Sequence, residues 1–304
     1  MRRIILFMLL ATLILSGCSG AKEAEPTEKP TEEQGQEMSI PIETVKTDSF
    51  EMDYFKFGSG DKVLVILPGL SVQSVMPSAQ AVADSYSMFE DDYTVYLFDR
   101  RKNPPETYSV YDMARDTAAA FEELGLAKAD IFGASQGGMM AMVIAIEHPE
   151  LVNKLILGST AASISDKGYE TIDKWVQLAK AGDAEGLYLG FGQMIYPEET
   201  FEQYRDTLIS VAKTVTDEEL AHFVINAQGI KGFDVLDDLD RIECPVLLLG
   251  SEDDNVLGAE ASEQIAERLE SHEGFEMHMY NGYGHAAYDL APDYKERMYN
   301  FLTK

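Results

Sequence analysis

The chain has 304 residues, with 53 acidic and 24 basic side chains and a formal net charge of −29. This acidity argues against nucleic acid as a partner and against a polybasic membrane-binding patch, because both require clustered Lys and Arg. Hydrophobic residues make up 45% of the chain, which is typical of a globular protein with a buried core.

The N-terminal segment 1–17 has two arginines directly after Met1, continues with a short apolar run and ends in small residues. The run is too short for a stable membrane span, and this order of features is typical of a secretory signal peptide. The segment Leu15-Ser16-Gly17-Cys18 resembles the lipobox of bacterial lipoproteins. That resemblance implies cleavage before Cys18 and acyl chains such as palmitate on its thiol and new amino group. The alternative is an ordinary secreted protein in which Cys18 simply follows the signal.

Residues 19–38 are rich in Glu, Pro, Thr and Gln and almost free of apolar side chains. Such a segment cannot bury enough surface to offset its ordering entropy. We therefore expect residues 18–40 to tether a folded domain, residues 41–304, to the outer side of the cell membrane through the lipid on Cys18. Removal of residues 1–17 would leave 22 basic side chains against 53 acidic ones and a net charge of −31.

Two cysteines are present, Cys18 and Cys244. If Cys18 carries a lipid, no disulfide can form within the chain. Cys244 precedes Pro245 and an apolar run, so we expect it to be buried as a small hydrophobic residue. The sequence has no Cys–His spacing typical of a metal site, and we predict no bound metal.

Strand-like and helix-like segments alternate from about residue 50 onward. The expected strands are 43–47, 50–57, 63–67, 94–98, 131–134, 154–157, 245–250 and 276–280. The expected helices are one that ends near 90, then 109–124, 136–147, 258–271 and one that begins at 286. This alternation predicts an α/β fold with a mostly parallel central sheet and helices on both faces. The stretch of about 163–240 interrupts the alternation and is mainly helical, so we interpret it as a cap insertion over the carboxyl edge of the sheet.

Ser135 lies in Gly133-Ala134-Ser135-Gln136-Gly137, between an expected strand and an expected helix. A sharp strand-to-helix reversal crowds the backbone, which the glycines relieve, and it exposes the serine at a helix N-terminus, where an oxyanion is stabilised. The alternative is a glycine-rich turn with an incidental serine. The pentapeptide in this setting resembles the nucleophile elbow of the α/β-hydrolase family, and the resemblance extends from about residue 50 to 302. It implies that Ser135 is the nucleophile of a hydrolase.

A serine hydroxyl needs a base to act as a nucleophile at neutral pH. In the family the catalytic histidine occupies the loop after the last strand, and this implies that His285 is the base. A solvent-exposed loop histidine is the alternative. The other histidines are expected at helix ends, in the cap or within a strand: His148, His222, His272 and His278.

The third member of the triad orients and stabilises the imidazolium. Similar hydrolases place this acid three residues after the glycine that ends the strand following the cap. With Gly250 as that glycine, the resemblance implies Asp253, with its neighbour Asp254 as the alternative. The chain order Ser135, Asp253, His285 is that of the family.

Acyl transfer also needs donors for the oxyanion. The resemblance implies the backbone N–H groups of Leu70 and Gln136. Relatives commonly have His-Gly in the loop after the first central strand, whereas this chain has Pro68-Gly69. The departure leaves open how the loop is held in place.

These features predict a serine hydrolase that forms an acyl-enzyme, requires no cofactor and acts on a small-molecule acyl substrate such as an ester, thioester or lactone. A serine nucleophile excludes the aspartate-dependent route of related dehalogenases and epoxide hydrolases. A C–C bond hydrolase or an aminopeptidase is the alternative, and a surface-tethered binding protein is another. The acidic side chains Glu198, Glu199 and Glu202 either anchor a substrate amine or form a solvated helix face.

The expected cap contains several aromatic side chains. Trp175, Tyr188 and Phe191 either line an apolar acyl pocket or pack the cap onto the core. The sequence leaves both readings open, together with the identity of the acyl group.

Overall fold

The structure is a computed structural model that describes residues 40–164 and 166–304, with only the backbone of residues 166 and 167. The predicted signal peptide at 1–17, Cys18 and the predicted tether up to residue 39 lie outside the described residues. Among the described helices, none combines the length and apolar character required to cross a membrane.

In the described part of the chain, eight strands form one sheet in the order β1-β2-β4-β3-β5-β6-β7-β8. Pairing is antiparallel for β1 with β2 and for β2 with β4, and parallel for every other pair. The strands are β1 (Ile42–Lys46), β2 (Glu51–Phe57), β3 (Lys62–Leu67), β4 (Tyr93–Arg101), β5 (Ala129–Ala134), β6 (Val152–Gly158), β7 (Val246–Ser251) and β8 (Phe275–Tyr280).

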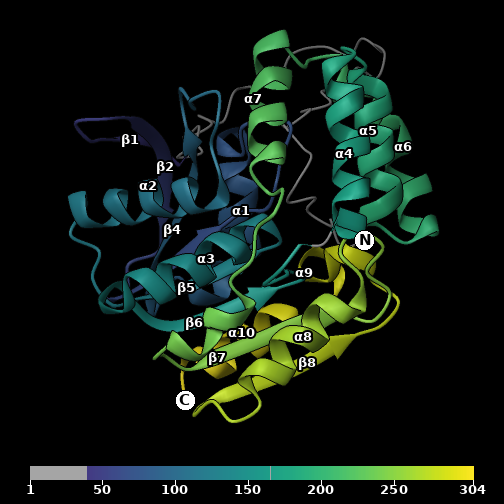
Figure 1. Cartoon of the computed structure of the whole chain (residues 1–304). Helices are drawn as coiled ribbons and strands as arrows, with labels where there is room; N and C mark the ends of the chain where they lie inside the picture. The colour runs from purple at the N-terminus through teal and green to yellow at the C-terminus, as the bar shows by residue number, and fades with distance from the viewer. Residues whose placement is uncertain (1–39, 165) are drawn as a thin grey trace, which may run out of the picture.

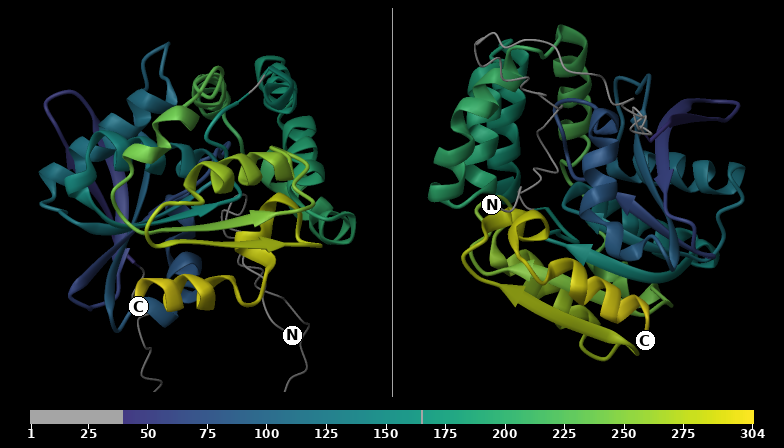
Figure 2. Two further views of the ribbon diagram at one scale, coloured as in Figure 1. Left: turned by 60° about the horizontal axis from the view of Figure 1, so that its bottom comes forward. Right: turned by 180° about the vertical axis from the view of Figure 1, so that it is seen from behind.

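Helices cover both faces of this sheet (Figure 1). Figure 2 shows α1 and α10 on one face and α2, α3 and α8 on the other. The bounds are α1 (Ala79–Ser85), α2 (Val110–Glu123), α3 (Gln136–Glu147), α8 (Ala259–Leu269), α9 (Ala287–Leu290) and α10 (Tyr294–Leu302). The predicted α/β architecture with a mostly parallel sheet is confirmed.

The central strands are continuous apolar runs because neither of their faces meets water. Every residue of β5 and of β7 is buried. Cys244, just before β7, is buried as a free thiol, as expected, and burial raises the pKa of this thiol to about 12.

The cap insertion lies between β6 and β7 and stands over the carboxyl edge of the parallel strands (Figure 1). It consists of α4 (Asp166–Lys180), α5 (Ala184–Ile195), α6 (Glu198–Ala212) and α7 (Asp217–Gln228), followed by a 3-10 turn (Leu236–Arg241). Its helices therefore cover the edge at which the loops after β3, β5, β7 and β8 meet.

The C-terminal segment differs from the single helix expected from Ala286. A 3-10 turn (Gly284–Ala286) leads into the short α9, and α10 starts only at Tyr294. Pro292 lies between α9 and α10. Because proline has no N–H to donate and its ring clashes with the preceding helical turn, a continuous helix cannot pass through this position.

Candidate active site

Ser135 occupies a strained turn between β5 and α3. Its φ of 52° and ψ of −119° are rare for a non-glycine residue, and such strain is typical of a nucleophile held at a sharp strand-to-helix turn. The backbone N–H of Ser135 donates to Gly158 O at 2.8 Å, and the Thr160 hydroxyl donates to Ser135 O at 2.7 Å. Both neighbours lie in or just after β6, so the adjacent strand end holds the turn.

Two glycines of the pentapeptide are required by close backbone approach. A Cβ on Gly133 would lie 2.4 Å from Gly137 O, and a Cβ on Gly137 would lie 2.0 Å from Leu67 O. No side chain fits at such distances. The elbow therefore packs directly on the end of β3, from which the loop with Leu70 begins.

His285 is buried, with an exposed fraction of 1%, and lies in the turn that follows β8. Its Nδ1 lies 2.8 Å from Asp254 Oδ2. The other carboxylate oxygen of Asp254 accepts from the backbone N–H groups of Val256 at 2.8 Å and Leu257 at 3.0 Å. The carboxylate is thus fixed on both sides, and Nε2 of His285 remains for a second partner.

The surroundings of Asp254 favour its ionised form. Burial alone would raise the pKa of this carboxyl, but the His285 imidazole and the Leu257 and Val256 N–H groups outweigh burial, so the pKa lies below its ordinary value. A carboxylate in this state can stabilise an imidazolium, which is the role of a triad acid.

The preference for Asp253 as the partner of His285 is therefore corrected to Asp254. Asp253 accepts instead from Ser251 Oγ at 2.9 Å and from the backbone N–H groups of Gly282 and Gly284, each at 3.1 Å. The physical reason is that β7 continues beyond Gly250, with Ser251 paired to β8. The longer strand shifts the turn by one residue, so Asp253 braces the loop before His285 and Asp254 reaches the ring.

Ser135 and His285 line one small pocket with a volume of about 20 Å³. Apart from these two side chains its lining is apolar and comes from both the core and the cap: Leu70, Met139, Ile172, Trp175, Phe191, Ile195, Ile230, Val256 and Leu257. The structure thus brings together Ser135, His285 and the loop residue Leu70 under the cap helices.

The cap aromatics divide between the two roles considered for them. Trp175 and Phe191 line this pocket and pack against each other, with ring centroids 4.1 Å apart. Tyr188 is not among the lining residues, and its hydroxyl donates to Gln73 Oε1 at 2.9 Å. Tyr188 therefore attaches the cap to the core, while the other two face the site.

Arg100, at the end of β4, supplies a brace for the loop after β3 that the sequence did not reveal. Its Nη2 donates to Pro68 O at 2.8 Å, to Gly69 O at 3.3 Å and to Gln136 Oε1 at 3.0 Å. Gln136 is fully buried, and its Nε2 donates to Asn226 O of α7 at 2.8 Å. As the first residue of α3, Gln136 also has a backbone N–H that the helix itself does not use.

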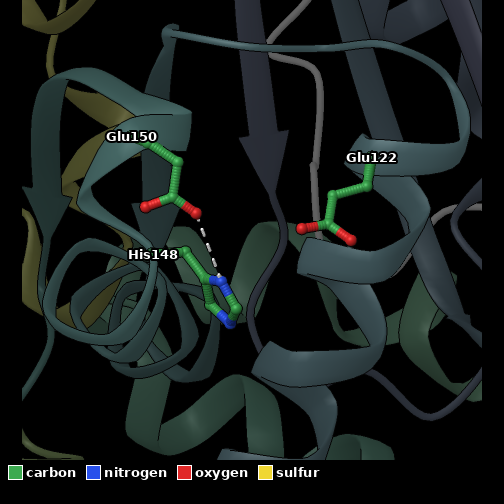
Figure 3. A group of neighbouring side chains, drawn as sticks. All are labelled: Glu122, His148 and Glu150. Carbon is green, nitrogen blue, oxygen red and sulfur yellow. Dashed lines mark ion pairs between the residues drawn. The ribbon is translucent and has the colours of Figure 1, made fainter.

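One group of side chains in the described residues could hold a metal ion, and it lies away from this pocket. Glu122, His148 and Glu150 place ligand atoms within 4.8 Å of one another, and His148 Nδ1 lies 3.6 Å from Glu150 Oε1 (Figure 3). His148 follows the C-terminal end of α3, whose 12 residues span about 18 Å from Ser135. Both glutamates are exposed, so this is a surface group separate from the pocket at Ser135.

Comparison with known proteins agrees with this architecture. Residues 62–292 match the family described as alpha/beta hydrolase fold. A proposed carbamate hydrolase, RutD of Caulobacter segnis, is 24% identical over 258 residues, which cover 80% of this chain and 92% of that protein. The 3-oxoadipate enol-lactonase 2 of Acinetobacter baylyi is 21% identical over 232 residues, 75% of this chain and 85% of that protein.

Solved structures share the fold. The alpha/beta hydrolase enzyme MGS-M2, from a Medee basin deep-sea metagenome library, superposes with a TM-score of 0.77 at 21% identity, covering 86% of this chain and 98% of that chain. The enol-lactonase of Burkholderia xenovorans LB400 superposes with a TM-score of 0.74 at 16% identity, covering 86% and 100%. With the family match extending over most of the chain, the protein belongs to the α/β-hydrolase fold family of enzymes.

Proposed function

We propose that the protein is a serine hydrolase that cleaves carboxylic esters, thioesters or lactones through an acyl-enzyme on Ser135. The observation that carries this proposal is that a strained serine and a buried histidine line one small pocket, with that histidine bonded to Asp254 at 2.8 Å. A nucleophile, a base and an orienting acid are the groups that acyl transfer requires.

In this mechanism Ser135 Oγ attacks the carbonyl carbon of the substrate and gives its proton to His285 Nε2. The carbonyl electrons move to the oxygen, which accepts hydrogen bonds from the N–H groups of Leu70 and Gln136. Collapse of this intermediate breaks the bond to the leaving group, which takes the proton from His285. Water then adds to the acyl-enzyme, gives a proton to His285, and releases the acid as Ser135 recovers its proton. Asp254 holds the imidazole throughout.

The lining of the pocket favours an ester or lactone as the substrate over a peptide with a free amino terminus. Its lining contains no carboxylate that could anchor an amine. Glu198 and Glu199 are exposed at the start of α6, and Glu202 pairs with Arg205 on the surface. The enol-lactonase named among the relatives supports the same substrate class.

The pocket volume supports a small acyl group. About 20 Å³ is little more than one water molecule needs, so a substrate must displace lining side chains. Val256 and Leu257 also line an outer groove of about 620 Å³. They form the wall between the two spaces, and of the pair Leu257 is the less buried.

Labelling with a fluorophosphonate probe tests the proposed function. We expect wild-type protein to incorporate one probe at Ser135, located by mass spectrometry of the peptide. A panel of p-nitrophenyl esters, lactones and aminoacyl anilides then identifies the substrate class, with esters or lactones turned over fastest. Folded protein that neither labels nor hydrolyses any of these substrates would rule out the hydrolase and favour a binding protein.

Leu257→Ala is expected to shift selectivity toward longer acyl chains, because it opens the small pocket toward the outer groove. The ratio of kcat/KM for the p-nitrophenyl hexanoate to that for the acetate should rise by at least about tenfold, since even one further methylene accommodated in an apolar pocket is worth about 1–3 kcal/mol. Leu124→Ala, at a partly buried leucine after α2 that does not line the pocket, serves as the matched control. An unchanged ratio in Leu257→Ala would refute its role as the wall.

We also propose that the protein is a lipoprotein anchored through Cys18 on the outer side of the membrane. The lipobox-like Leu15-Ser16-Gly17-Cys18 and the polar segment 19–38 support this proposal. Mass spectrometry of the N-terminal peptide from membrane fractions should show an acylated Cys18. Recovery of unmodified protein from the medium would instead indicate ordinary secretion.

A further inference from the structure

The proposed oxyanion hole is built from two pieces of chain that are far apart in the sequence. One N–H belongs to Leu70, in the loop after β3, and the other to Gln136, at the start of α3. Oxyanion stabilisation depends on donors that are already in place when the charge develops. Their relative position must therefore be fixed by contacts between the loop and the helix start.

A single guanidinium makes contacts of this kind. Arg100 Nη2 donates at 2.8 Å to Pro68 O and at 3.3 Å to Gly69 O on the loop, and at 3.0 Å to Gln136 Oε1 on the helix. The three acceptors share the two N–H groups of this one nitrogen. Because the guanidinium is planar and rigid, the directions of these N–H groups are fixed, and acceptors on separate segments are held in a fixed relation. Arg100 thus connects both halves of the proposed hole.

The bond to Gly69 O also orients the donor of Leu70. The carbonyl of Gly69 and the N–H of Leu70 belong to one peptide unit, which is planar and trans, so the two groups point in opposite directions. When Gly69 O turns toward Arg100, the Leu70 N–H turns away from it. Leu70 lines the pocket with Ser135 and His285, so the orientation of this peptide decides whether its N–H can reach an oxyanion that forms there.

The charge on Arg100 acts in the same sense. Burial lowers the pKa of this guanidinium and the Asp99 carboxylate opposes the effect, but an arginine remains protonated at neutral pH. A partly buried cation beside the loop favours negative charge developing on the substrate oxygen, because the low dielectric of the interior weakens screening. Its Nε has no hydrogen-bond partner among the described residues.

We propose that Arg100 is the positioning residue of the oxyanion hole, which it holds through the loop with Pro68 and Gly69 and through Gln136. The proposal rests on the proposed function, since it concerns the transition state of that acyl transfer. Arg100 acts through the backbone of Leu70 and the side chain of Gln136, and not by contact with the substrate.

Arg100→Met and Arg100→Lys test the proposal in the full chain. Arg100→Met removes the Nη2 donor and the charge, and we expect kcat for p-nitrophenyl acetate to fall by about 10²–10³-fold, the loss typical of one missing oxyanion donor, with KM close to the wild-type value. Arg100→Lys keeps the charge but replaces the planar guanidinium by a flexible ammonium, and should give an intermediate kcat. Arg101→Met is the matched control, because Arg101 pairs with Asp116 and should leave kcat unchanged.

Affinity for 1,1,1-trifluorobutan-2-one separates positioning from a purely structural effect. Its adduct with a serine carries an oxyanion, so its inhibition constant should rise across the variants in proportion to the loss of kcat/KM, as expected of a transition-state mimic. If Arg100→Met does not fold, Arg100→Lys alone carries the test. Wild-type kcat and wild-type inhibition in a folded Arg100 variant would overturn the proposal. Failure of the proposed function itself would appear differently, as a wild-type protein without activity or labelling.

Discussion

Replacement of Ser135 by alanine is expected to lower kcat for ester hydrolysis by about 10⁶-fold, the loss seen when the nucleophile of a serine triad is removed. The variant cannot form an acyl-enzyme, and what remains is hydrolysis by water in the pocket. Steady-state kinetics with p-nitrophenyl acetate and the loss of fluorophosphonate labelling measure the effect. The strained backbone of Ser135 is imposed by Gly133, Gly137 and the Thr160 bond, so the fold should remain intact.

Ser262→Ala is the control for Ser135→Ala. Ser262 is a buried serine of α8 and lies outside the pocket, so its loss should not change kcat. Retention of wild-type ester hydrolysis in Ser135→Ala would show that a different residue is the nucleophile.

Asp254→Asn is expected to lower kcat by about 10⁴-fold with KM little changed, because an amide favours the wrong tautomer of the triad histidine and cannot stabilise the imidazolium. The substitution would replace the charged contact between Asp254 Oδ2 and His285 Nδ1, which are 2.8 Å apart, by a neutral one. The pH dependence of activity, measured on a folded preparation of the variant, distinguishes the loss of the triad acid from a loss of folded protein.

Asp253→Asn separates the two neighbouring acids. Asp253 holds the loop before His285 through Gly282 and Gly284 N–H, and an asparagine retains one acceptor oxygen. We therefore expect a fall in kcat of about tenfold at most, the size of an effect on positioning and far below that of a lost triad acid. A larger loss for Asp253→Asn than for Asp254→Asn would reverse the assignment.

Asp254 also links stability to pH. Because the pKa of its carboxyl lies below the ordinary value in the fold, its ionised form stabilises the folded state at any pH above the unfolded pKa of about 4. That contribution is lost as the pH falls through the lower folded value. The difference in free energy of unfolding between wild type and Asp254→Asn, measured by urea titration, should therefore shrink from neutral to acid pH.

Much of the site could be predicted because it depends on local chemistry. A serine between glycines at a strand-to-helix turn and a histidine after the last strand are features of short segments. Their resemblance to the corresponding segments of α/β-hydrolases led to Ser135 and His285, which line the same pocket. The triad acid could not be fixed in this way. Whether Asp253 or Asp254 reaches the ring depends on where β7 stops pairing with β8, which is a property of two strands together.

Arg100 shows a different limit. No local pattern connects it with Pro68 or Gln136, which come from two other elements, and the sequence left open how the loop with Pro68 is held in place. The parallel pairing of β3 with β4 and with β5 brings these strand ends to one edge of the sheet. The contact therefore follows from the topology and could not be deduced from the residues alone. The bounds of the expected strands, in contrast, agree with the structure to within a few residues. The roles of the cap aromatics became clear only from their packing in the structure.

The hydrogen bond from the Gln136 side chain to Asn226 O has a consequence for engineering. One way to change the specificity of such a protein is to replace its helical cap insertion by the cap of another protein. In this protein Gln136, the residue after Ser135, is bonded to a carbonyl of α7, the last cap helix, and is fully buried. A chimaera that supplies no acceptor at that point would leave a buried amide unpaired, at a cost of about 1–3 kcal/mol. A transplanted cap must therefore provide a hydrogen-bond acceptor for the Gln136 side chain in addition to its own pocket residues.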